Sequence, residues 1–292
     1  MLIEDNVYIL QDGWMQRNAR SLDLARWVFL TRQADEQAVL EALAAFQNPD
    51  GGFGHALEPD CWNPSSAPLQ TWVATTILRE LNLFDPKISL INRLTDYLCA
   101  SIAGGVWQTV MPTNNDYPRA AWWTYDPESA TWGYNPTAAL LGYLARIGIY
   151  LEAEIHQALE SFFSRPITDM HELRLFIDLC EDLAQIDWNS SELAQMRSKL
   201  VQDCQTVIEP DSDKWTGYVC RPSQVIKLAL PPYLETLRGL VEQEKVYLRD
   251  SVNADGTWEV SWEWGQFPEQ FAVAKNWWKA SLIIQYHHFL AI

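Results

Sequence analysis

The sequence predicts an all-α fold, and three observations support this prediction. Apolar residues recur at three- and four-residue spacing through most of the 292-residue chain, as they do on one face of an α-helix. No segment convincingly alternates apolar and polar residues in the way that a half-buried β-strand requires. Three loops share a glycine two positions before an aromatic residue, which indicates an internal repeat of helical hairpins.

Two amphipathic helices are expected near the start of the chain, at 21–32 and 34–46. The second helix leads directly into a loop at 47–60, which reads Q-N-P-D-G-G-F-G-H-A-L-E-P-D. After this loop, Ser66 is expected to cap a helix that carries Pro68 in its first turn. The loop therefore connects two helices and combines turn residues with titratable side chains.

Ser89 is expected to cap the next helix, and a long connection at 104–134 follows it. Loops of this length are uncommon in compact domains, and an aromatic-rich one is expected to be ordered. Asn135 and Pro136 then begin a helix that Gly148 ends. Further helices are expected at about 151–163, 170–186, 190–207, 233–248 and 268–289.

The internal repeat predicts how these helices are arranged. The aromatic residues that end the three similar loops are Phe53, Trp107 and Trp258, which lie 54 and 151 residues apart. Trp215 lies close to a further expected position, so the chain contains about six units of two helices each. Because the units are degenerate and one loop is very long, a closed ring is favoured over an open solenoid. We therefore expect a single α-α toroid domain over 1–292, with about six inner and six outer helices.

The composition disfavours several classes of partner. The formal net charge of −17 repels phosphate backbones and anionic lipids, so no nucleic-acid partner is expected. The first eleven residues lack the pattern of a secretory signal, and no stretch approaches the roughly 20 apolar residues of a transmembrane helix. Five widely spaced cysteines suit a reducing compartment, so a cytoplasmic location is predicted. The oligomeric state is not indicated.

The loop at 47–53 carries a resemblance to a known superfamily. With the preceding Ala-Ala-Phe, it resembles the glutamine-tryptophan repeat of squalene-hopene cyclases and of protein prenyltransferase β subunits. Weaker copies end at Trp107 and Trp258, with Ile102 and Val252 in place of the glutamine. The resemblance implies an α-α toroid of terpenoid-cyclase type. The repeat is a clamp between helices, so it does not by itself imply an activity.

His55, Glu58 and Asp60 are the candidate catalytic residues, because a turn requires none of them. One of the two carboxylic acids could donate a proton, with His55 positioning or reprotonating it. The alternative is that these carboxylates cap helices or lie in solvent. Class II terpene cyclases use an aspartate-rich D-x-D-D motif that this chain lacks, so an acid would come from Glu58, Asp60, Asp126 or Glu128.

The prenyltransferase resemblance also raises the possibility of a zinc site. Asp60 and Cys61 are similar to two of the ligands of that family, and His287 or His288 could supply a third. The aspartate and cysteine are adjacent here, however, whereas the family separates them by one residue. The basic residues that would hold a diphosphate are also missing. No metal and no cofactor is therefore predicted.

Aromatic residues from two parts of the chain form the second candidate constellation. In a closed ring the two chain ends meet, so both groups could line one cavity and contact an apolar substrate or stabilise a cation. The alternative is that they form the core of a lid. The predicted substrate-binding residues are Trp122, Trp123, Tyr125, Asp126, Trp132, Tyr134, Trp262, Trp264 and Trp277, with Trp278 in the same cluster.

The leading functional prediction is a terpenoid-cyclase-like protein that binds an apolar, isoprenoid-type small molecule. As an enzyme it would carry out acid-initiated cyclisation or isomerisation, with Asp60 or Glu58 as the proton donor. One alternative is a glycan-processing α6/α6 barrel, which would need two carboxyl groups across an open cleft. A second alternative is a protein that binds its ligand without catalysis.

Overall fold

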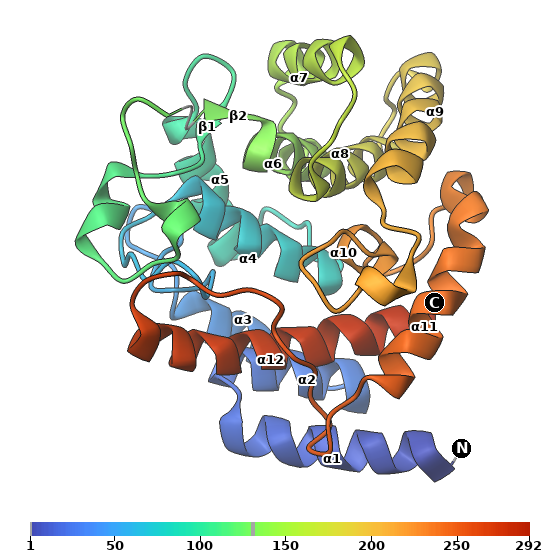
Figure 1. The fold of residues 1–292 in the computed structure, drawn as a ribbon. Coiled ribbons are helices and arrows are strands. Elements are labelled where there is room, and N and C mark those ends of the chain that lie inside the picture. Colours follow the sequence, from blue (N-terminus) through green and yellow to red (C-terminus); the bar gives the residue numbers. More distant parts are fainter. Residues whose placement is uncertain (1, 130–131) are drawn as a thin grey trace.

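The computed structural model describes residues 2–129 and 132–292, and almost all of its regular structure is helical. Twelve α-helices lie within these ranges, which confirms the predicted all-α class (Figure 1). The helices are α1 Leu2–Asn18, α2 Ser21–Arg32, α3 Gln37–Ala44, α4 Pro68–Glu80, α5 Ser89–Ser101, α6 Tyr134–Arg146, α7 Glu152–Ser164, α8 Met170–Leu183, α9 Ser190–Val207, α10 Pro222–Val225, α11 Arg238–Asp250 and α12 Pro268–Ala291.

Short elements complete the chain. Strands β1 (Trp107–Gln108) and β2 (Trp132–Gly133) pair antiparallel within the long connection. Four 3-10 helices cover Pro112–Asp116, Ala121–Trp123, Ser212–Lys214 and Pro232–Leu237. None of the helices in the described ranges has both the length and the apolar character needed to cross a bilayer.

Most predicted helices are present, with three kinds of exception. Helices α1 and α10 were not predicted, and the residues before Arg238 form a 3-10 turn where an α-helix was expected. The expected serine caps are wrong. Ser66 donates to Asp50 Oδ1 at 2.6 Å instead of capping α4, and Ser89 is the first residue of α5, where Ile88 is the N-cap. Helix α10 has only four residues, too short for a periodic signal.

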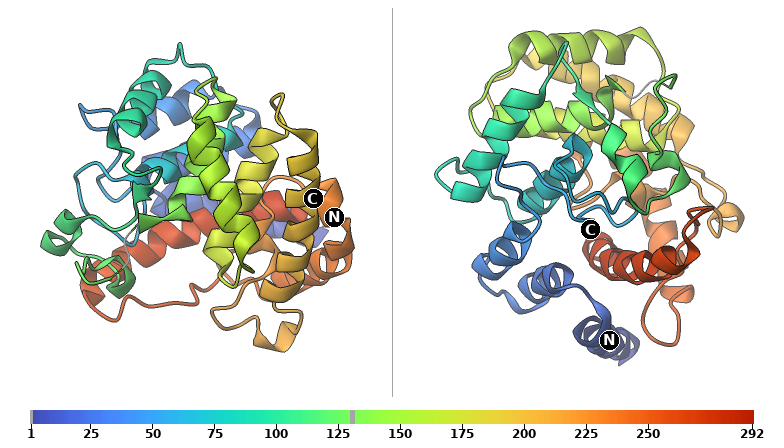
Figure 2. Two further views of the ribbon diagram at one scale, coloured as in Figure 1. Left: turned by 90° about the horizontal axis from the view of Figure 1, so that it is seen from above. Right: turned by 90° about the vertical axis from the view of Figure 1, so that its left-hand side faces the viewer.

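The even-numbered helices pack on one another in chain order, from α4 through α6, α8 and α10 to α12, and α12 packs on α2. The Arg26–Glu80 ion pair, at 2.8 Å, links α2 to α4. The odd-numbered helices each pack on an even-numbered neighbour, and α1 contacts both α2 and α12. Figures 1 and 2 accordingly show α12 alongside α1 and α2, although these helices come from opposite ends of the chain.

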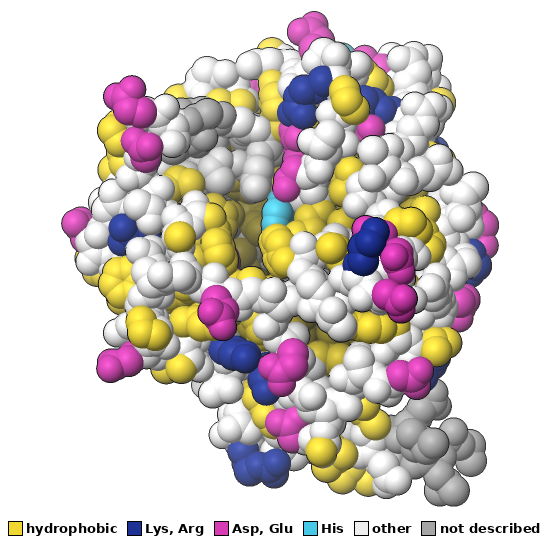
Figure 3. Space-filling model, in the orientation of Figure 1, with side chains coloured by type: hydrophobic (Ala, Val, Ile, Leu, Met, Phe, Trp, Pro, Cys, Tyr) yellow, Lys and Arg dark blue, Asp and Glu magenta, His cyan; other side chains and the backbone are white. Residues whose placement is uncertain are grey.

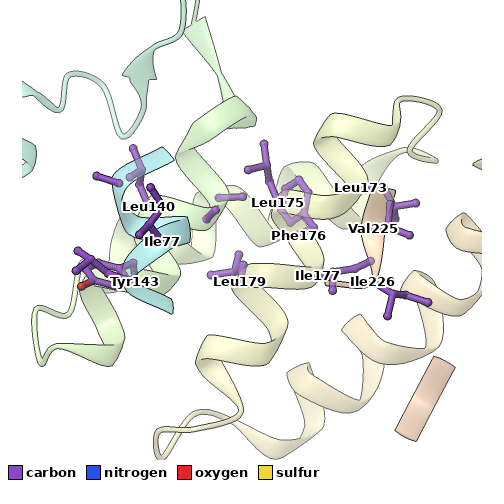
Figure 4. Packing of buried hydrophobic residues seen from close by; sticks show 14 of the residues in the cluster. Ile77, Leu140, Tyr143, Leu173, Leu175, Phe176, Ile177, Leu179, Val225 and Ile226 are labelled. Atoms are coloured by element: carbon purple, nitrogen blue, oxygen red, sulfur yellow. The ribbon is translucent and has the colours of Figure 1, made fainter. Parts of the chain in front are cut away.

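The hydrophobic core follows this series of helices. Figure 4 shows Ile77 and Leu140 at one end of a buried cluster and Val225 and Ile226 at the other, with α8 side chains between them. Helix α6 is buried on all sides along most of its length, which explains its nearly continuous apolar sequence. Gly142 allows the close approach of α6 and α8, since a Cβ there would lie 2.8 Å from Asp182 Oδ2.

The sequence repeat corresponds to a repeated turn. Gly51, Gly105 and Gly256 occupy equivalent positions and all adopt positive φ, at 93°, 83° and 85°. Trp107 and Trp258 each donate their indole N–H to a carbonyl near the end of the preceding helix, to Leu98 O at 3.0 Å and Leu248 O at 2.9 Å. These turns therefore fasten a loop to the helix before it, as expected of a structural clamp.

Phe53 occupies the same position in the first copy but has no indole N–H to donate. In that copy Gln47 supplies the side-chain bond to a helix, donating to Leu90 O in the first turn of α5 at 2.9 Å. The same amide also donates to Gly51 O at 2.9 Å, which holds the turn closed. Gln47 is therefore structural, as the repeat predicted.

The connections that lead from odd- to even-numbered helices contact one another. Trp62 N donates to Pro118 O at 3.0 Å, which joins the loop after α3 to the long connection after α5. Ala121 N donates to Trp264 O at 3.1 Å, which joins that connection to the segment before α12. Figure 1 shows the long connection beside the start of α12. This meeting of loops positions the candidate site.

Candidate functional site

Asp60 is the centre of the candidate site. Its side chain is buried, with 3% of its surface exposed, and it accepts hydrogen bonds from three tryptophan indoles. Trp264 and Trp278 donate to Oδ1 at 2.7 and 2.6 Å, and Trp262 donates to Oδ2 at 3.0 Å. Two of these tryptophans precede α12 and one lies within it, so the carboxylate joins the first quarter of the chain to the last.

Glu58 lies beside Asp60 and is also buried, with 6% of its surface exposed. Its Oε2 accepts the backbone N–H of Asp60 at 2.9 Å, so the two carboxyl groups belong to one tight turn. Gln70 on α4 stabilises this turn through two hydrogen bonds. Its Oε1 accepts the Glu58 N–H at 2.6 Å and its Nε2 donates to Cys61 O at 2.8 Å.

The residues before Glu58 shape the turn. Gly54 passes so close to the other side of the loop that a Cβ there would lie 2.2 Å from Pro64 O. Ala56 adopts positive φ, and its carbonyl accepts a hydrogen bond from Arg20 Nη1 at 2.7 Å. Close packing and hydrogen bonding thus fix the loop that carries both acids, as pre-organised sites require.

The two carboxyl groups have different electrostatic environments. Burial, together with the nearby charge of Asp60, raises the pKa of Glu58 well above its ordinary value, and the Asp60 N–H, the Trp123 indole and Arg20 oppose this only in part. Burial also raises the pKa of Asp60, but three indole N–H groups oppose it by stabilising the charged form. These surroundings therefore favour a proton on Glu58 and the negative charge on Asp60.

Aromatic rings surround this pair. Trp62 stacks on Trp277 with centroids 5.2 Å apart and meets Trp264 edge-on at 6.1 Å. The Arg20 guanidinium lies 5.0 Å from the Trp277 ring centroid. Trp123 contributes a buried indole N–H that lies close enough to Glu58 to favour its charged form, although it does not form a hydrogen bond of standard geometry. The acids therefore lie in a largely apolar, aromatic setting in which charge is weakly screened.

A histidine and a tyrosine lie on the other side of Trp262. Tyr218 meets the Trp262 ring edge-on at 6.1 Å, and its hydroxyl lies 2.8 Å from His171 Nε2. Both side chains keep exposed surface, but desolvation by the surrounding protein lowers the pKa of His171 and favours the neutral imidazole. Burial, together with the charges of Asp169, Asp60 and Glu58, raises the pKa of Tyr218 to about 12. The pair is a neutral imidazole and a neutral phenol, able to accept and relay a proton.

Two hollows each have in their wall one of the tryptophans that lie near the acids. Figure 3 shows hydrophobic side chains gathered around a hollow in the face of the molecule that Figure 1 presents. One hollow has a volume of about 370 Å³, and Trp262 belongs to its wall. The other has a volume of about 550 Å³, and Trp123 belongs to its wall. The aromatic residues in the wall of the first hollow are Trp215, Tyr247, Trp258, Trp262 and Tyr286. The wall of the second includes Trp122, Trp123, Tyr134, Arg165, Asp169 and Glu172.

The predicted site residues are thus distributed unevenly. Glu58, Asp60, Trp262, Trp264 and Trp277 come together. His55 lies apart from the acids: it is exposed, and its Nε2 lies 2.9 Å from Asn48 Oδ1.

The other predicted residues lie in the long connection. Asp126 is exposed and accepts hydrogen bonds from Glu128 N and Ser129 Oγ, so it shapes a local turn. The backbone of Tyr125 bonds to Asn115, and Trp122 and Tyr134 border the second hollow. The side chain of Trp132 lies outside the described part of the structure.

The residues considered for zinc do not fit a metal. Both Asp60 oxygens accept indole N–H groups, and burial raises the pKa of the Cys61 thiol to about 12, against thiolate formation. His287 packs edge-on against Trp27 at 5.2 Å, and His288 lies near Arg26 and Glu80. Across residues 2–129 and 132–292 no group of three His, Cys, Asp or Glu side chains could hold a metal ion.

His171 and Tyr218 were missed in the sequence because they lie 47 residues apart. One signal could have pointed to Tyr218. Tyr218, Trp262, Glu58 and Asp60 each follow a repeated aromatic residue by three to seven positions. A search of the segments just after the repeated turns would have found most of the site.

Comparisons with known proteins give no relative for this chain: no protein-family model, no curated protein and no solved structure matches it. The site must therefore be interpreted from its own geometry.

Proposed function

We propose that this protein is an enzyme in which Glu58 donates a proton to a small-molecule substrate. The observation that carries the proposal is the asymmetry of the buried acid pair, in which Asp60 is held as an anion by three indoles and Glu58 keeps a proton beside it. Paired carboxyl groups whose environments separate their pKa values are typical of acid catalysis. A proton donor at neutral pH needs such a raised pKa.

The reaction that we propose is acid-initiated isomerisation or cyclisation. Such a reaction needs one group to protonate a double bond and another to remove a different proton from the resulting cation. Glu58 supplies the first proton, and the electron pair of the double bond forms the new C–H bond. His171, directly or through the Tyr218 hydroxyl, accepts the second proton, and the electrons of that C–H bond form the new double bond. The proton count of the substrate is unchanged.

The aromatic residues around the acids support an isoprenoid-type substrate. The faces of indole rings attract cations through their quadrupole, by about 0.5–2 kcal/mol for each ring. Four tryptophans lie near the acid pair, and two of them, Trp123 and Trp262, also belong to the walls of the hollows. The other two are Trp62 and Trp277, which stack on each other. A carbocation formed at Glu58 would be stabilised by these rings and shielded from water.

We further propose that α2, α4, α6, α8, α10 and α12 close into the inner ring of an α-α toroid, with the odd-numbered helices outside it. The α12–α2 packing and the Arg26–Glu80 pair support this closure, because they join the two ends of the series. The architecture would agree with the resemblance to terpenoid cyclases. The formal charge of −17 and the scattered free cysteines support a cytoplasmic protein without a nucleic-acid partner.

A second candidate is a glycan-processing enzyme, and one observation favours it. The hollow of about 550 Å³ is open and combines Trp122, Trp123 and Tyr134 with the charged groups of Arg165, Asp169 and Glu172. Rings for stacking and side chains for hydrogen bonding suit a sugar better than a hydrocarbon. Glu58 would then protonate the glycosidic oxygen.

Turnover of two substrate panels tests the proposal. Purified protein is incubated with isoprenoid alcohols and diphosphates of several chain lengths, and separately with oligosaccharides, and products are identified by mass spectrometry. In the panel that is turned over, Glu58→Gln should lower kcat by roughly 10²- to 10⁴-fold, because glutamine keeps the shape but carries no acidic proton. Tyr218→Phe should lower kcat less than Glu58→Gln does. It should also change the limb of the pH–rate profile that reports the pKa of the base.

Asp126→Asn, which changes an exposed carboxylate by the same chemistry, is the matched control and should leave kcat unchanged. Full activity in Glu58→Gln would overturn the assignment of the acid. Saturable binding of a panel member without turnover by wild-type protein would instead support the non-catalytic alternative.

A further inference from the structure

Two partly buried cations, Arg174 and Lys227, have no acidic partner within ion-pair distance. Arg174 lies on α8 and Lys227 lies two residues after the end of α10, and neither belongs to the acid site described above. No carboxylate of the described residues lies within 4.0 Å of either charged group. Buried charges are almost always paired, because removing an ion from water is costly. This pair therefore requires an explanation.

The Arg174 guanidinium has five N–H groups and forms no hydrogen bond with any described residue. Its Nε is fully buried and unpartnered, whereas the residue as a whole keeps some exposure. The guanidinium carbon lies 5.2 Å from the ring centroid of Trp72, whose own indole N–H is also buried and unpartnered. The guanidinium therefore lies near an aromatic ring, while the Arg174 side chain keeps some exposed surface.

Lys227 makes one hydrogen bond, from Nζ to Ser223 O at 2.9 Å. This bond satisfies a carbonyl at the end of the short helix α10, which is a structural role in itself. An ammonium group has three N–H donors, however, so two remain for another partner. Burial and the nearby charge of Arg174 lower the pKa of Lys227 well below its ordinary value.

The acidic groups nearby do not neutralise these cations. Asp178 and Glu80 act on both cations from a distance. Glu80 already pairs with Arg26, whose Nη2 donates hydrogen bonds to both Glu80 oxygens, each at 2.8 Å. Glu244 also acts on Lys227, but both of its oxygens accept hydrogen bonds from Ser223. His171 is the remaining titratable neighbour, and both cations favour its neutral form. Around Arg174 and Lys227, hydrogen-bond donors therefore outnumber the acceptors that are free to bind them.

We propose that Arg174, Lys227 and the indole N–H of Trp72 form a binding site for a compact anionic group, a carboxylate or a phosphate. The site lies where the inward-facing sides of α4, α8 and α10 meet. Guanidinium groups bind such oxyanions through two parallel hydrogen bonds, and an ammonium adds a point charge. Trp72 fixes the plane of the guanidinium and supplies one further donor. The proposal does not depend on the role of Glu58, because the two sites share no residue.

Binding of two simple anions to the full-length protein tests this site. Sodium phosphate and sodium acetate are titrated separately by isothermal calorimetry and thermal unfolding, against sodium chloride at the same ionic strength. The wild-type protein should show saturable binding and a rising Tm with at least one of the two anions. Which anion binds more tightly distinguishes a phosphate-bearing ligand from a carboxylate-bearing one.

Lys227→Met removes the charge but keeps the length of the side chain, and Arg174→Gln removes the guanidinium. Each should weaken the anion by roughly 10- to 100-fold, because a hydrogen bond to a charged group contributes about 1.5–3 kcal/mol. Lys245→Met is the matched control, since this lysine is also buried but pairs with Glu242 at 2.9 Å. It should bind the anion as wild type does, and so should Glu58→Gln.

Equal binding by wild type and Lys227→Met would overturn the proposal, and so would the absence of saturable binding with both anions. If Arg174→Gln does not fold, Lys227→Met decides the outcome alone. A purely structural lysine would change stability in this variant without changing the response to anions.

Discussion

The first and third copies of the repeated turn have the same backbone geometry but carry different chemistry. Asn48 N donates to Gly52 O at 2.8 Å, and Asn253 N donates to Thr257 O at 2.8 Å. The following residues then diverge. After Phe53 the chain presents the two buried acids, and after Trp258 it presents two of the indoles that bind Asp60.

This difference shows how a repeat can form an asymmetric site. The turn is fixed by glycine conformation and by hydrogen bonds within a few residues, so every copy can keep it. The segments after the turns are free to differ, and the fold brings them together. One copy therefore supplies the carboxylate and another supplies its donors, and the following predictions test how far this division of roles extends.

The largest effect is expected from the turn itself. Gly51→Ala should lower the free energy of unfolding by at least about 3 kcal/mol, because positive φ is combined with a severe clash. A Cβ at Gly51 would lie 2.0 Å from the carbonyl oxygen of Arg93, whereas one at Gly256 would have its nearest neighbour, Gln11 N, at 3.0 Å. Gly256→Ala should therefore cost only about 1–2 kcal/mol. Urea denaturation measures both, and equal costs would contradict this ranking.

Removing an indole donor from the third copy should lower the free energy of unfolding by less than Gly51→Ala does, and the two tryptophans of this copy should differ. Trp264→Phe removes a donor to the charged Asp60, which should cost about 1.5–3 kcal/mol beyond the loss of volume. Trp258→Phe removes a donor to a neutral carbonyl, which should cost about 1 kcal/mol beyond the same loss of volume. Denaturation of both variants at pH 7 gives the difference. A larger cost for Trp258→Phe would mean that Asp60 does not depend on its indoles.

The acid pair should make stability depend on pH. The folded state raises the pKa of Glu58 above its ordinary value of 4.5, so protonation favours folding. The stability that protonated Glu58 contributes is complete below pH 4.5 and is lost as the pH rises through the pKa of Glu58 in the folded state. Glu58→Gln cannot ionise, so its stability relative to wild type should increase with pH, by about 1.4 kcal/mol for each unit of pKa shift. Parallel stability curves between pH 4 and 9 would show that Glu58 is not perturbed.

The smallest effect is expected where a carboxylate lies outside the meeting point of the loops. Asp126→Asn should change the free energy of unfolding by no more than about 0.5 kcal/mol, because this side chain is exposed and bonds only within its own turn. A loss of ligand binding in this variant would show that the long connection closes over the site. Calorimetric titration of the same ligand into wild type and variant makes the measurement.

The fold was predictable to the extent that its signals are local. Helices α2 and α9 have the expected limits because their apolar residues follow a clear period and few turn residues interrupt them. The predicted capping roles of Ser66 and Ser89 were wrong, because Ser66 donates to Asp50 in another part of the loop and Ser89 already lies within α5. Helix α1 was missed because its apolar residues only face a partner once α12 is in place.

The candidate site was predictable in its residue types but not in its pairing. Glu58 and Asp60 were predicted as site residues because a turn does not require two carboxylates. The clustered tryptophans were predicted because they are unusually numerous. The sequence does not indicate that three of these indoles point at one carboxylate, since this depends on the packing of α12. His171 carries no local signal, because it is an ordinary residue until the fold brings it beside Tyr218.

The bonds from Trp262, Trp264 and Trp278 to Asp60 span 202, 204 and 218 residues. A chain that is still being synthesised cannot form them until most of its length has emerged, and closing such long loops is entropically costly and slow. The surroundings that raise the pKa of Glu58 are therefore completed late in folding. Until then Glu58 is an ordinary surface carboxylate, deprotonated at neutral pH. A partly folded chain consequently lacks the buried acid, and the proton-holding group arises only together with the finished structure.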